Sequence, residues 1–230
     1  MIEALLFDLD GTILDTTELI VESFLFTFRQ GLGKTVSRQS VMEHFGMSLD
    51  DEFLAMCPSL SVGQIENLVA LYRRHNRAHH DQMVSLVPGA DEVLRKLEHQ
   101  GLPLAVVTSK RQDMAEHGLK LFGLDKIFAT IVHHDSTSQH KPHPEPLYYA
   151  LEALGVSSQN AWYVGDSPYD MIAAKMAGCL AIGFSYNTFG VEELMESGAN
   201  SIVYSWPELY ALWQTNMSTG DSENPGAKAD

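Results

Sequence analysis

Acidic, hydroxyl and lysine side chains follow the short apolar runs of this sequence. Asp8 and Thr108 each come directly after such a run, Asp166 follows a third run with one glycine between, and Lys141 lies in a polar loop. The carboxyl ends of parallel strands meet at one edge of a sheet, and ligands bind at that edge. We therefore expect these four side chains to converge on one site.

These four side chains are suited to holding a metal ion and a phosphoryl group. Asp8 and Asp166 offer hard carboxylate oxygens, which are the ligands that Mg²⁺ uses in proteins. Lys141 can offset the charge of a transferring phosphoryl group, and the Thr108 hydroxyl with nearby backbone N–H groups can donate hydrogen bonds to its oxygens. The residue types favour magnesium-assisted phosphoryl chemistry.

The elements that must position these residues alternate along most of the chain. The apolar runs that we expect to form strands span residues 4–7, 104–107, 129–132, 163–164 and 180–184. Between them, apolar residues recur at helical spacing. Strands that alternate with helices predict the α/β class, with a parallel sheet covered on both faces and joined by right-handed crossovers.

Capping residues predict where two of the helices begin. Ser167, Pro168 and Asp170 supply a capping hydroxyl, a proline at the first helical position and an acid three residues after the cap. Ser109 and Gln112 repeat the spacing of a capping box. The helix after Ser109 is expected to carry a stripe made of Met114, His117, Gly118 and Leu121.

A long helical segment interrupts the alternation after the first strand. Residues 15–86 carry helical apolar stripes and are too long for a crossover in a compact α/β unit. We therefore expect a helical cap domain over residues 15–86, inserted into a core domain formed by residues 1–14 and 87–215. Residues 216–230 are polar and contain Gly, Ser and Pro, which predicts a disordered tail.

The composition is that of an acidic globular protein. Among 230 residues, 15 are Lys or Arg and 30 are Asp or Glu, for a formal net charge of −15, which disfavours nucleic acid and anionic membranes as partners. No apolar stretch approaches the roughly 18 residues of a membrane helix, and the first residues lack the basic region of a signal peptide. Cys57 and Cys179 form no C-x-x-C pair. We expect a cytoplasmic protein without a disulfide.

Four motifs of the sequence resemble those of the haloacid-dehalogenase-superfamily phosphohydrolases. They are Asp8-Leu9-Asp10-Gly11-Thr12, Thr108-Ser109, Lys141-Pro142 and Gly165-Asp166-Ser167-Pro168-Tyr169-Asp170, in the expected order over nearly the whole chain. The resemblance implies a Rossmann-like, doubly wound core with an inserted helical cap of the C1 type, and a phosphotransferase site that depends on Mg²⁺. It also implies that Asp8 is the nucleophile and forms an aspartyl-phosphate that water then cleaves.

The resemblance extends these roles to the other motif residues. The expected set is Asp8, Asp10 and Asp166 for the metal, with Asp10 binding through its backbone carbonyl; Thr108, Ser109 and Lys141 for phosphate; and Thr12 and Asp170 in support of the metal site. Four of these residues also have a purely structural alternative. Thr108 and Ser109 can cap the next helix, Lys141 can be a solvated loop lysine, and Asp170 can act only in its capping box.

Asp10 has a further expected role in proton transfer. A carboxylate two residues after the nucleophile can protonate the leaving oxygen and then deprotonate the attacking water. In the superfamily that this sequence resembles, the dehalogenase branch carries no acid at this position. Asp10 therefore argues for hydrolysis of a phosphate ester or anhydride.

The expected cap contains a segment, residues 72–81, that is rich in cationic and imidazole side chains for so acidic a chain. A cationic helix above a phosphate site would suit a small, highly charged anion, whereas the alternative is a solvated basic face paired with neighbouring acids. His75 and His79 have the spacing of a zinc pair. However, no glutamate accompanies them and no third ligand is evident.

Part of the cap, together with one segment of the core, also resembles the PpaX-type pyrophosphatases and the related phosphoglycolate phosphatases. The matching segments are Thr17-Glu18-Leu19-Ile20, Tyr72-Arg73, Asn76, His80-Asp81 and residues 118–125. This resemblance implies hydrolysis of inorganic pyrophosphate, with phosphoglycolate or another small phosphate ester as the alternative substrate. Arg73, Asn76 and His80 are then the candidate contacts to a small phosphorylated anion.

Two other functions use a similar set of residues. A non-enzymatic phospho-acceptor of the receiver type combines a strand-end aspartate with Thr or Ser, Lys and magnesium, but it has no large insertion after the first strand and no equivalent of Asp10-Gly11-Thr12. A sugar phosphomutase would keep the aspartyl-phosphate long enough to phosphorylate its substrate again.

Overall fold

The computed structural model describes residues 2–220 of the chain, and in this part the centre is a six-stranded parallel sheet. The strand order is β5-β4-β1-β6-β7-β8. The strands are β1 (Ala4–Phe7), β4 (Leu104–Val107), β5 (Thr130–Val132), β6 (Ala161–Gly165), β7 (Leu180–Phe184) and β8 (Ser201–Val203). The predicted α/β class and parallel sheet are confirmed, whereas β8 is a strand that the apolar runs did not predict.

The strand order reverses direction next to β1. From β1 the chain adds β4 and then β5 on one side, and it then crosses the sheet to add β6, β7 and β8 on the other side. β1 and β6 are direct neighbours, with Phe7 paired to Val164. Such a reversal leaves a crevice at the carboxyl ends of the two neighbouring strands. Since Asp8 and Asp166 follow these two strands, the topology brings them together.

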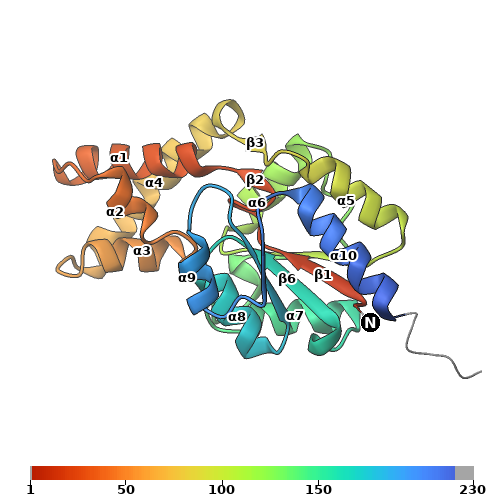
Figure 1. Ribbon diagram of the computed structural model, residues 1–230. Coiled ribbons are helices and arrows are strands. Elements are labelled where there is room, and N and C mark those ends of the chain that lie inside the picture. Colours follow the sequence, from red (N-terminus) through yellow and green to blue (C-terminus); the bar gives the residue numbers. More distant parts are fainter. Residues whose placement is uncertain (1, 221–230) are drawn as a thin grey trace, which may run out of the picture.

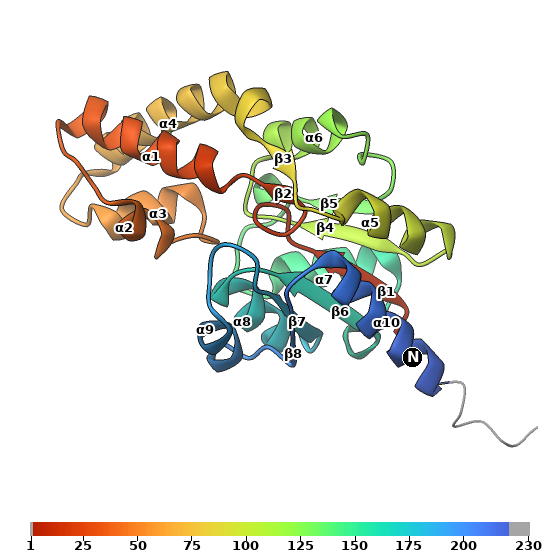
Figure 2. The ribbon, with the colours of Figure 1, turned by 45° about the horizontal axis from the view of Figure 1, so that its top comes forward.

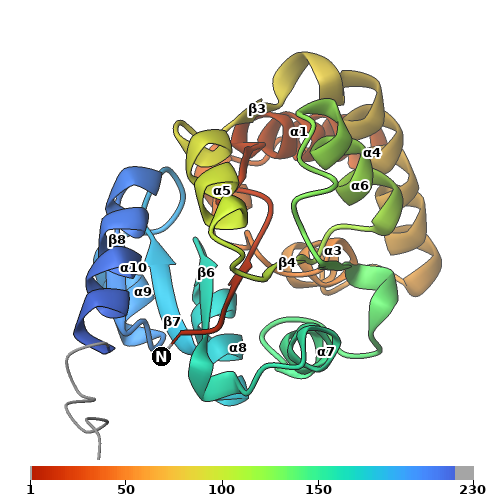
Figure 3. The ribbon, with the colours of Figure 1, turned by 90° about the vertical axis from the view of Figure 1, so that its right-hand side faces the viewer.

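Helices cover both faces of the sheet (Figure 3). One face is covered by α5 (Ala90–His99), α6 (Gln112–Leu121) and α10 (Trp206–Gly220), and the other by α7 (Glu145–Leu154), α8 (Pro168–Ala177) and α9 (Val191–Glu196). Two short 3₁₀ helices, η1 (His134–Ser136) and η2 (Ser158–Asn160), lie in connecting loops. All residues of β1 and β4 are buried. Burial on both faces explains why these strands are continuous apolar runs without alternation.

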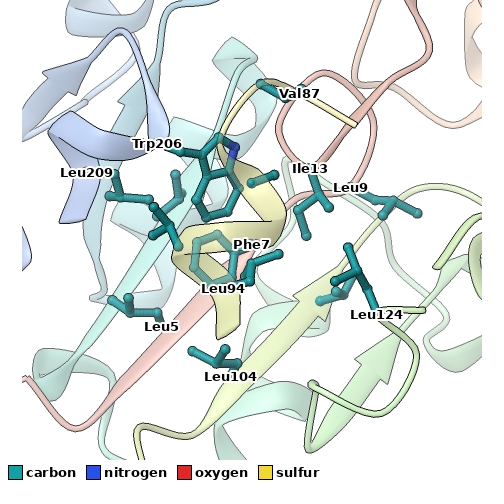
Figure 4. Close-up of a cluster of buried hydrophobic side chains, with 14 of the residues drawn as sticks. Leu5, Phe7, Leu9, Ile13, Val87, Leu94, Leu104, Leu124, Trp206 and Leu209 are labelled. Carbon is teal, nitrogen blue, oxygen red and sulfur yellow. The ribbon is translucent and has the colours of Figure 1, made fainter. Parts of the chain in front are cut away.

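Trp206, the first residue of α10, fills the apolar core beneath α5 (Figure 4). Its ring is fully buried and its centroid lies 5.2 Å from that of Phe7. The indole Nε1 donates a hydrogen bond of 3.0 Å to the backbone carbonyl of Thr12. The core thus holds the loop after β1 from behind, and this loop carries Asp8 and Asp10.

Four helices form an apolar cluster of their own beside the sheet (Figures 1 and 2). They are α1 (Thr17–Leu32), α2 (Arg38–Met42), α3 (Leu49–Met56) and α4 (Val62–Met83). Phe24 lies at the centre of this cluster, with its ring centroid 4.8 Å from those of Phe53 and Tyr72. Two short antiparallel strands, β2 (Leu14–Asp15) and β3 (Ser85–Leu86), pair where the chain enters and leaves the helical unit.

Helix α6 differs from its predicted form. It begins at Gln112, whose N–H donates to Asp135 Oδ2 at 3.0 Å, so the predicted capping box of Ser109 is wrong. The buried residues of α6 are Ala115, Gly118 and Leu119. The predicted stripe is therefore rotated from the observed one, because small residues let the helix approach the rest of the core closely.

The chain end also differs from its prediction. Helix α10 continues to Gly220, so the expected disorder is wrong for residues 216–220, and the rest of that segment lies outside the described residues. Cys57 and Cys179 are both buried and unpaired, as expected. Among the described helices, none combines the length and the apolar character needed to cross a bilayer.

Candidate active site

A cavity of about 360 Å³ lies between the carboxyl edge of the sheet and the helical unit. The predicted site residues that line it are Asp8, Asp10, Thr108, Ser109, Lys141 and Asp166 from the sheet side, and Arg73 and Asn76 from the helical side. Residues from four separate loops therefore meet at one cavity. We expected the side chains that follow the strand ends to converge on one site, and in the structure they line the same cavity.

Lys141 lies at the buried end of this cavity and connects two carboxylates. Its Nζ donates to Asp8 Oδ1 at 2.7 Å and to Asp170 Oδ1 at 2.6 Å, and it lies 3.1 Å from the Tyr163 hydroxyl. The Lys141 side chain is 2% exposed. The alternative of a solvated loop lysine is therefore excluded by the structure.

Asp170 has two structural tasks. Its Oδ2 accepts hydrogen bonds from the Ser167 hydroxyl at 2.6 Å and from the Ser167 N–H at 3.0 Å, which completes the predicted capping box of α8. Its Oδ1 accepts from Lys141, as described above. Because one carboxylate serves both tasks, the start of α8 fixes the position of the lysine.

Three buried carboxyl groups form a candidate metal centre. Asp8, Asp166 and Asp170 each offer an oxygen, and these oxygens lie within 4.8 Å of one another. Burial raises the pKa of Asp8 to about 7, although Lys141 opposes the shift, and burial together with the charge of Asp8 raises the pKa of Asp166 well above its ordinary range. This excess of negative charge over the single lysine would be relieved by a divalent cation.

The donor set fits Mg²⁺. Both oxygens of Asp170 already accept hydrogen bonds from Lys141 and Ser167. Asp8 and Asp166 are therefore the carboxylates with oxygens to spare, and carboxylate oxygens are the ligands that Mg²⁺ prefers. Asp10 is not part of this cluster, and its Oδ1 accepts a hydrogen bond from Lys110.

The raised pKa of Asp8 predicts a pH-dependent stability of the metal-free protein. The folded state keeps the Asp8 proton up to a pKa of about 7, whereas an ordinary aspartate loses it near 3.8. Stability from this group is therefore present at low pH and is lost as the pH rises from 3.8 through about 7. We expect the melting temperature of the metal-free protein to fall more steeply with rising pH for the wild type than for Asp8→Asn. If both melting temperatures changed with pH in parallel, Asp8 would not have the raised pKa.

Gly11 is required by the close approach of Asp166. Its φ is +83°, and a Cβ atom built on it would lie 2.2 Å from Asp166 Oδ2. We expect Gly11→Ala to displace the Asp166 carboxylate and abolish activity, measured as phosphate release. Gly33→Ala is the matched control, because Gly33 also has a positive φ, of +64°, but has open space around it. Both variants should lose about 1–2 kcal/mol of stability from backbone strain, and equal activity in both would contradict the prediction.

Asp10 is paired with a residue that the sequence reasoning did not select. The Lys110 Nζ donates to Asp10 Oδ1 at 2.5 Å, and the two side chains are 13% and 21% exposed. Lys110 directly follows the predicted phosphate-binding pair, so its position in the motif was the available signal. The pair holds the Asp10 side chain at the cavity wall.

The remaining residues predicted on the sheet side lie at or behind the cavity. Thr108 Oγ1 accepts from the Lys110 N–H at 3.1 Å, and the Ser109 hydroxyl donates to the Gly46 carbonyl of the helical unit at 3.2 Å. Thr12 is fully buried and does not line the cavity. Gly46 approaches the core so closely that a Cβ atom on it would lie 2.5 Å from Ser167 Oγ. The helical unit therefore packs directly on the loops of the sheet.

The three candidate residues of the helical unit divide between cavity and core. Arg73 lines the cavity, with its Nη2 3.5 Å from Asp50 Oδ2. Asn76 also lines it, and its Nδ2 lies 3.4 Å from both Ser23 Oγ and the Tyr72 hydroxyl. His80 is fully buried away from the cavity, so it does not contact a ligand bound there. The prediction of His80 as a substrate contact is not supported by its position.

Glu52 and Arg77 of the helical unit also line the cavity, although neither was among the candidate contacts. Glu52 is buried, and burial together with the charge of Asp10 raises its pKa well above the ordinary range. Arg77 forms an ion pair with Asp113 on α6. Both were missed because only the packing of the helical unit against the sheet brings them to the site.

The geometry agrees with the proteins that this chain resembles. Residues 5–184 match the family model described as haloacid dehalogenase-like hydrolase. Over 208 residues the chain is 39% identical to the pyrophosphatase PpaX of Halalkalibacterium halodurans, and this match covers 90% of the chain and 95% of that protein.

Solved structures show the same architecture. A predicted phosphoglycolate phosphatase from Haemophilus somnus superposes with a TM-score of 0.83 at 25% identity, over 93% of this chain and 98% of that one. A predicted phosphatase from Clostridium acetobutylicum gives a TM-score of 0.84 at 28% identity, over 94% of this chain and 100% of that one. The chain therefore belongs to the haloacid dehalogenase-like hydrolases.

Proposed function

We propose that the protein is a phosphohydrolase in which Asp8 attacks the phosphoryl group and forms an aspartyl-phosphate. The observation that carries the proposal is the contact between Asp8 and Lys141 at 2.7 Å, beside the Asp166 carboxylate and at the end of an open cavity. The lysine offsets the negative charge of the transferring group, and the rigid contacts of Lys141 hold it in position before substrate arrives.

Asp8 and Asp166 would hold Mg²⁺, together with the backbone carbonyl of Asp10. The ion would supply charge neutralisation between the carboxylate nucleophile and the anionic substrate. The chain itself provides the remaining functions. Thr108 and Ser109 would donate hydrogen bonds to phosphoryl oxygens, while Thr12 and Asp170 support the loops from behind.

Asp10 would transfer protons on the leaving-group side. Its carboxylate lies at the cavity wall and is held by Lys110 at 2.5 Å. A carboxyl group there would protonate the leaving oxygen in the first step and accept a proton from the attacking water in the second. The same group can serve both steps because the first leaves it deprotonated.

We further propose that residues 15–86 act as a cap that excludes water and selects a small phosphorylated anion, through Arg73 and Asn76. Inorganic pyrophosphate is the substrate that the 39% identity to a pyrophosphatase favours. Phosphoglycolate is the second candidate, because a predicted phosphoglycolate phosphatase shares the fold at 25% identity. The acidic composition and unpaired cysteines favour action in the cytoplasm.

The experiment that tests the proposal is steady-state phosphate release with Mg²⁺. Pyrophosphate, phosphoglycolate and a panel of sugar phosphates would be compared by kcat/KM. A thousandfold advantage for one substrate corresponds to about 4 kcal/mol of differential transition-state stabilisation and would identify it. Absence of phosphate release from every substrate would contradict the proposal. Conversion of a sugar phosphate into an isomer without release of phosphate would indicate a phosphomutase.

Asp10→Asn should separate the two substrate classes. The leaving group of pyrophosphate is phosphate, whose second pKa is about 6. Phosphate therefore departs with less need for protonation than the alkoxide that leaves from a phosphate ester. We expect the variant to slow phosphate esters more than pyrophosphate, as measured by kcat for each substrate. Equal losses on both would remove the role of Asp10 as the leaving-group acid.

A further inference from the structure

Three metal-ligating side chains meet where the end of α4 packs against α6. His80 Nδ1 lies 2.9 Å from Asp81 Oδ1, and His117 Nε2 lies 2.7 Å from the same oxygen. One ligand atom of each side chain lies within 4.8 Å of those of the others. His80 and Asp81 belong to the helical unit and His117 to the sheet side, so only tertiary packing assembles the cluster.

We propose that His80, Asp81 and His117 form a binding site for a divalent transition-metal ion, with Zn²⁺ as the best match. Two imidazole nitrogens and one carboxylate oxygen are a ligand set that zinc uses, with a water molecule in the fourth position. The imidazoles distinguish this cluster from the carboxylates of Asp8 and Asp166, whose hard oxygens suit Mg²⁺. The proposal does not rest on the proposed phosphohydrolase activity.

The positions of the three side chains allow metal binding after a small adjustment. Tetrahedral zinc with bonds of about 2.0–2.2 Å separates its ligand atoms by roughly 3.4 Å. The observed contacts of 2.7 and 2.9 Å must therefore open by about 0.5–0.7 Å. The side chains of His117 and Asp81 are 48% and 55% exposed, so they are free to move outward while the buried His80 stays in place.

The contacts of the two helical-unit side chains show which atoms face the cluster. His80 Nδ1 lies 2.9 Å from Asp81 Oδ1. Of the two ring nitrogens of His80, Nε2 is buried without a hydrogen-bond partner among the described residues. Nδ1 is the nitrogen directed at Asp81, so it is the one that would bind the ion.

The neighbouring histidines of α4 provide an internal comparison. His75 and His79 are stacked, with ring centroids 4.2 Å apart, and His79 Nδ1 is hydrogen-bonded to the backbone carbonyl of His75 at 2.9 Å. No third side chain joins them in a cluster of ligand atoms within the described residues. The structure therefore favours the His80 cluster over the pair that the sequence spacing indicated.

Calorimetric titration of the full chain with Zn²⁺ tests the proposal. The protein is first freed of metal and then kept in excess Mg²⁺, which occupies the carboxylate site during the titration. We expect one Zn²⁺ per chain in the wild type and in His79→Ala, and an affinity at least about tenfold weaker in His117→Ala and Asp81→Asn. Zn²⁺ should raise the melting temperature of the wild type but not of His117→Ala.

Each contrary result overturns the proposal. Absence of Zn²⁺ binding by the wild type rules out the site. Equal affinity of the wild type and His117→Ala would locate the ion elsewhere, and loss of binding in His79→Ala would assign it to the pair with His75. Because the His117 side chain is half exposed, His117→Ala should fold normally, and a melt without zinc checks this.

Discussion

Asp8→Asn should lose turnover almost completely while keeping its fold. Removal of a catalytic nucleophile typically lowers kcat by about four to six orders of magnitude. Asparagine has nearly the shape of aspartate, and its amide oxygen can still accept the hydrogen bond that Lys141 Nζ donates at 2.7 Å in the wild type. Phosphate release with Mg²⁺ measures the first expectation, and thermal melting monitored by circular dichroism measures the second.

The control for this variant is Asp91→Asn, because Asp91 is a half-exposed residue on α5 that pairs only with Arg95 among the contacts described. It should retain full activity. A trap with beryllium trifluoride identifies the attacked atom directly, since the adduct forms on the nucleophile. Substantial turnover of Asp8→Asn, or an adduct on another side chain, would disprove the assignment of Asp8.

Lys141→Met should cost both stability and activity. The lysine is buried and joins Asp8 to Asp170, so its removal leaves two buried carboxyl groups without their counter-charge. Loss of one partner of a buried ion pair typically costs about 3–5 kcal/mol of unfolding free energy. We expect a loss of that size in urea denaturation of the metal-free protein, together with a fall of at least about a hundredfold in kcat/KM.

The stability loss of Lys141→Met should depend on pH and on metal. Low pH protonates Asp8, whose pKa is raised to about 7, and Mg²⁺ replaces part of the missing positive charge. Both conditions should therefore narrow the difference in unfolding free energy between the variant and the wild type. Lys120→Met is the matched control, because Lys120 forms an exposed ion pair with Glu116 at 3.2 Å and should lose less than about 1 kcal/mol. A gap that is equally large at low pH would show that lost packing, not unpaired charge, destabilises the variant.

The sequence alone was sufficient to predict the fold class and the location of the site along the chain. Strands buried on both faces are continuous apolar runs, and loop residues at their carboxyl ends must share one edge of a parallel sheet. Asp8, Thr108 and Asp166 were therefore recognisable as neighbours in space. The capping box of α8 was also predictable, because it depends on residues within one turn.

Predictions that depended on the orientation of one helix were less accurate. The stripe assigned to α6 was rotated, since Ala115 and Leu119 are buried beside the predicted Gly118, whereas Met114 and Leu121 are not. A helical pattern of mixed polarity has more than one apolar direction, and the neighbouring elements decide which direction is buried. Strand β8 lies at the edge of the sheet and is only partly buried, so its residues form no clear apolar run.

Contacts between the helical unit and the sheet were decided only by the tertiary structure. Arg73 and Asn76 reach the cavity, whereas His80 on the same helix is buried elsewhere and meets His117. Helical spacing determines which residues of α4 share a face, but it contains no information about which face meets α6 and which meets the cavity. The chemistry near each strand end is local and readable from the sequence, whereas the choice of partners across the two units depends on how they pack.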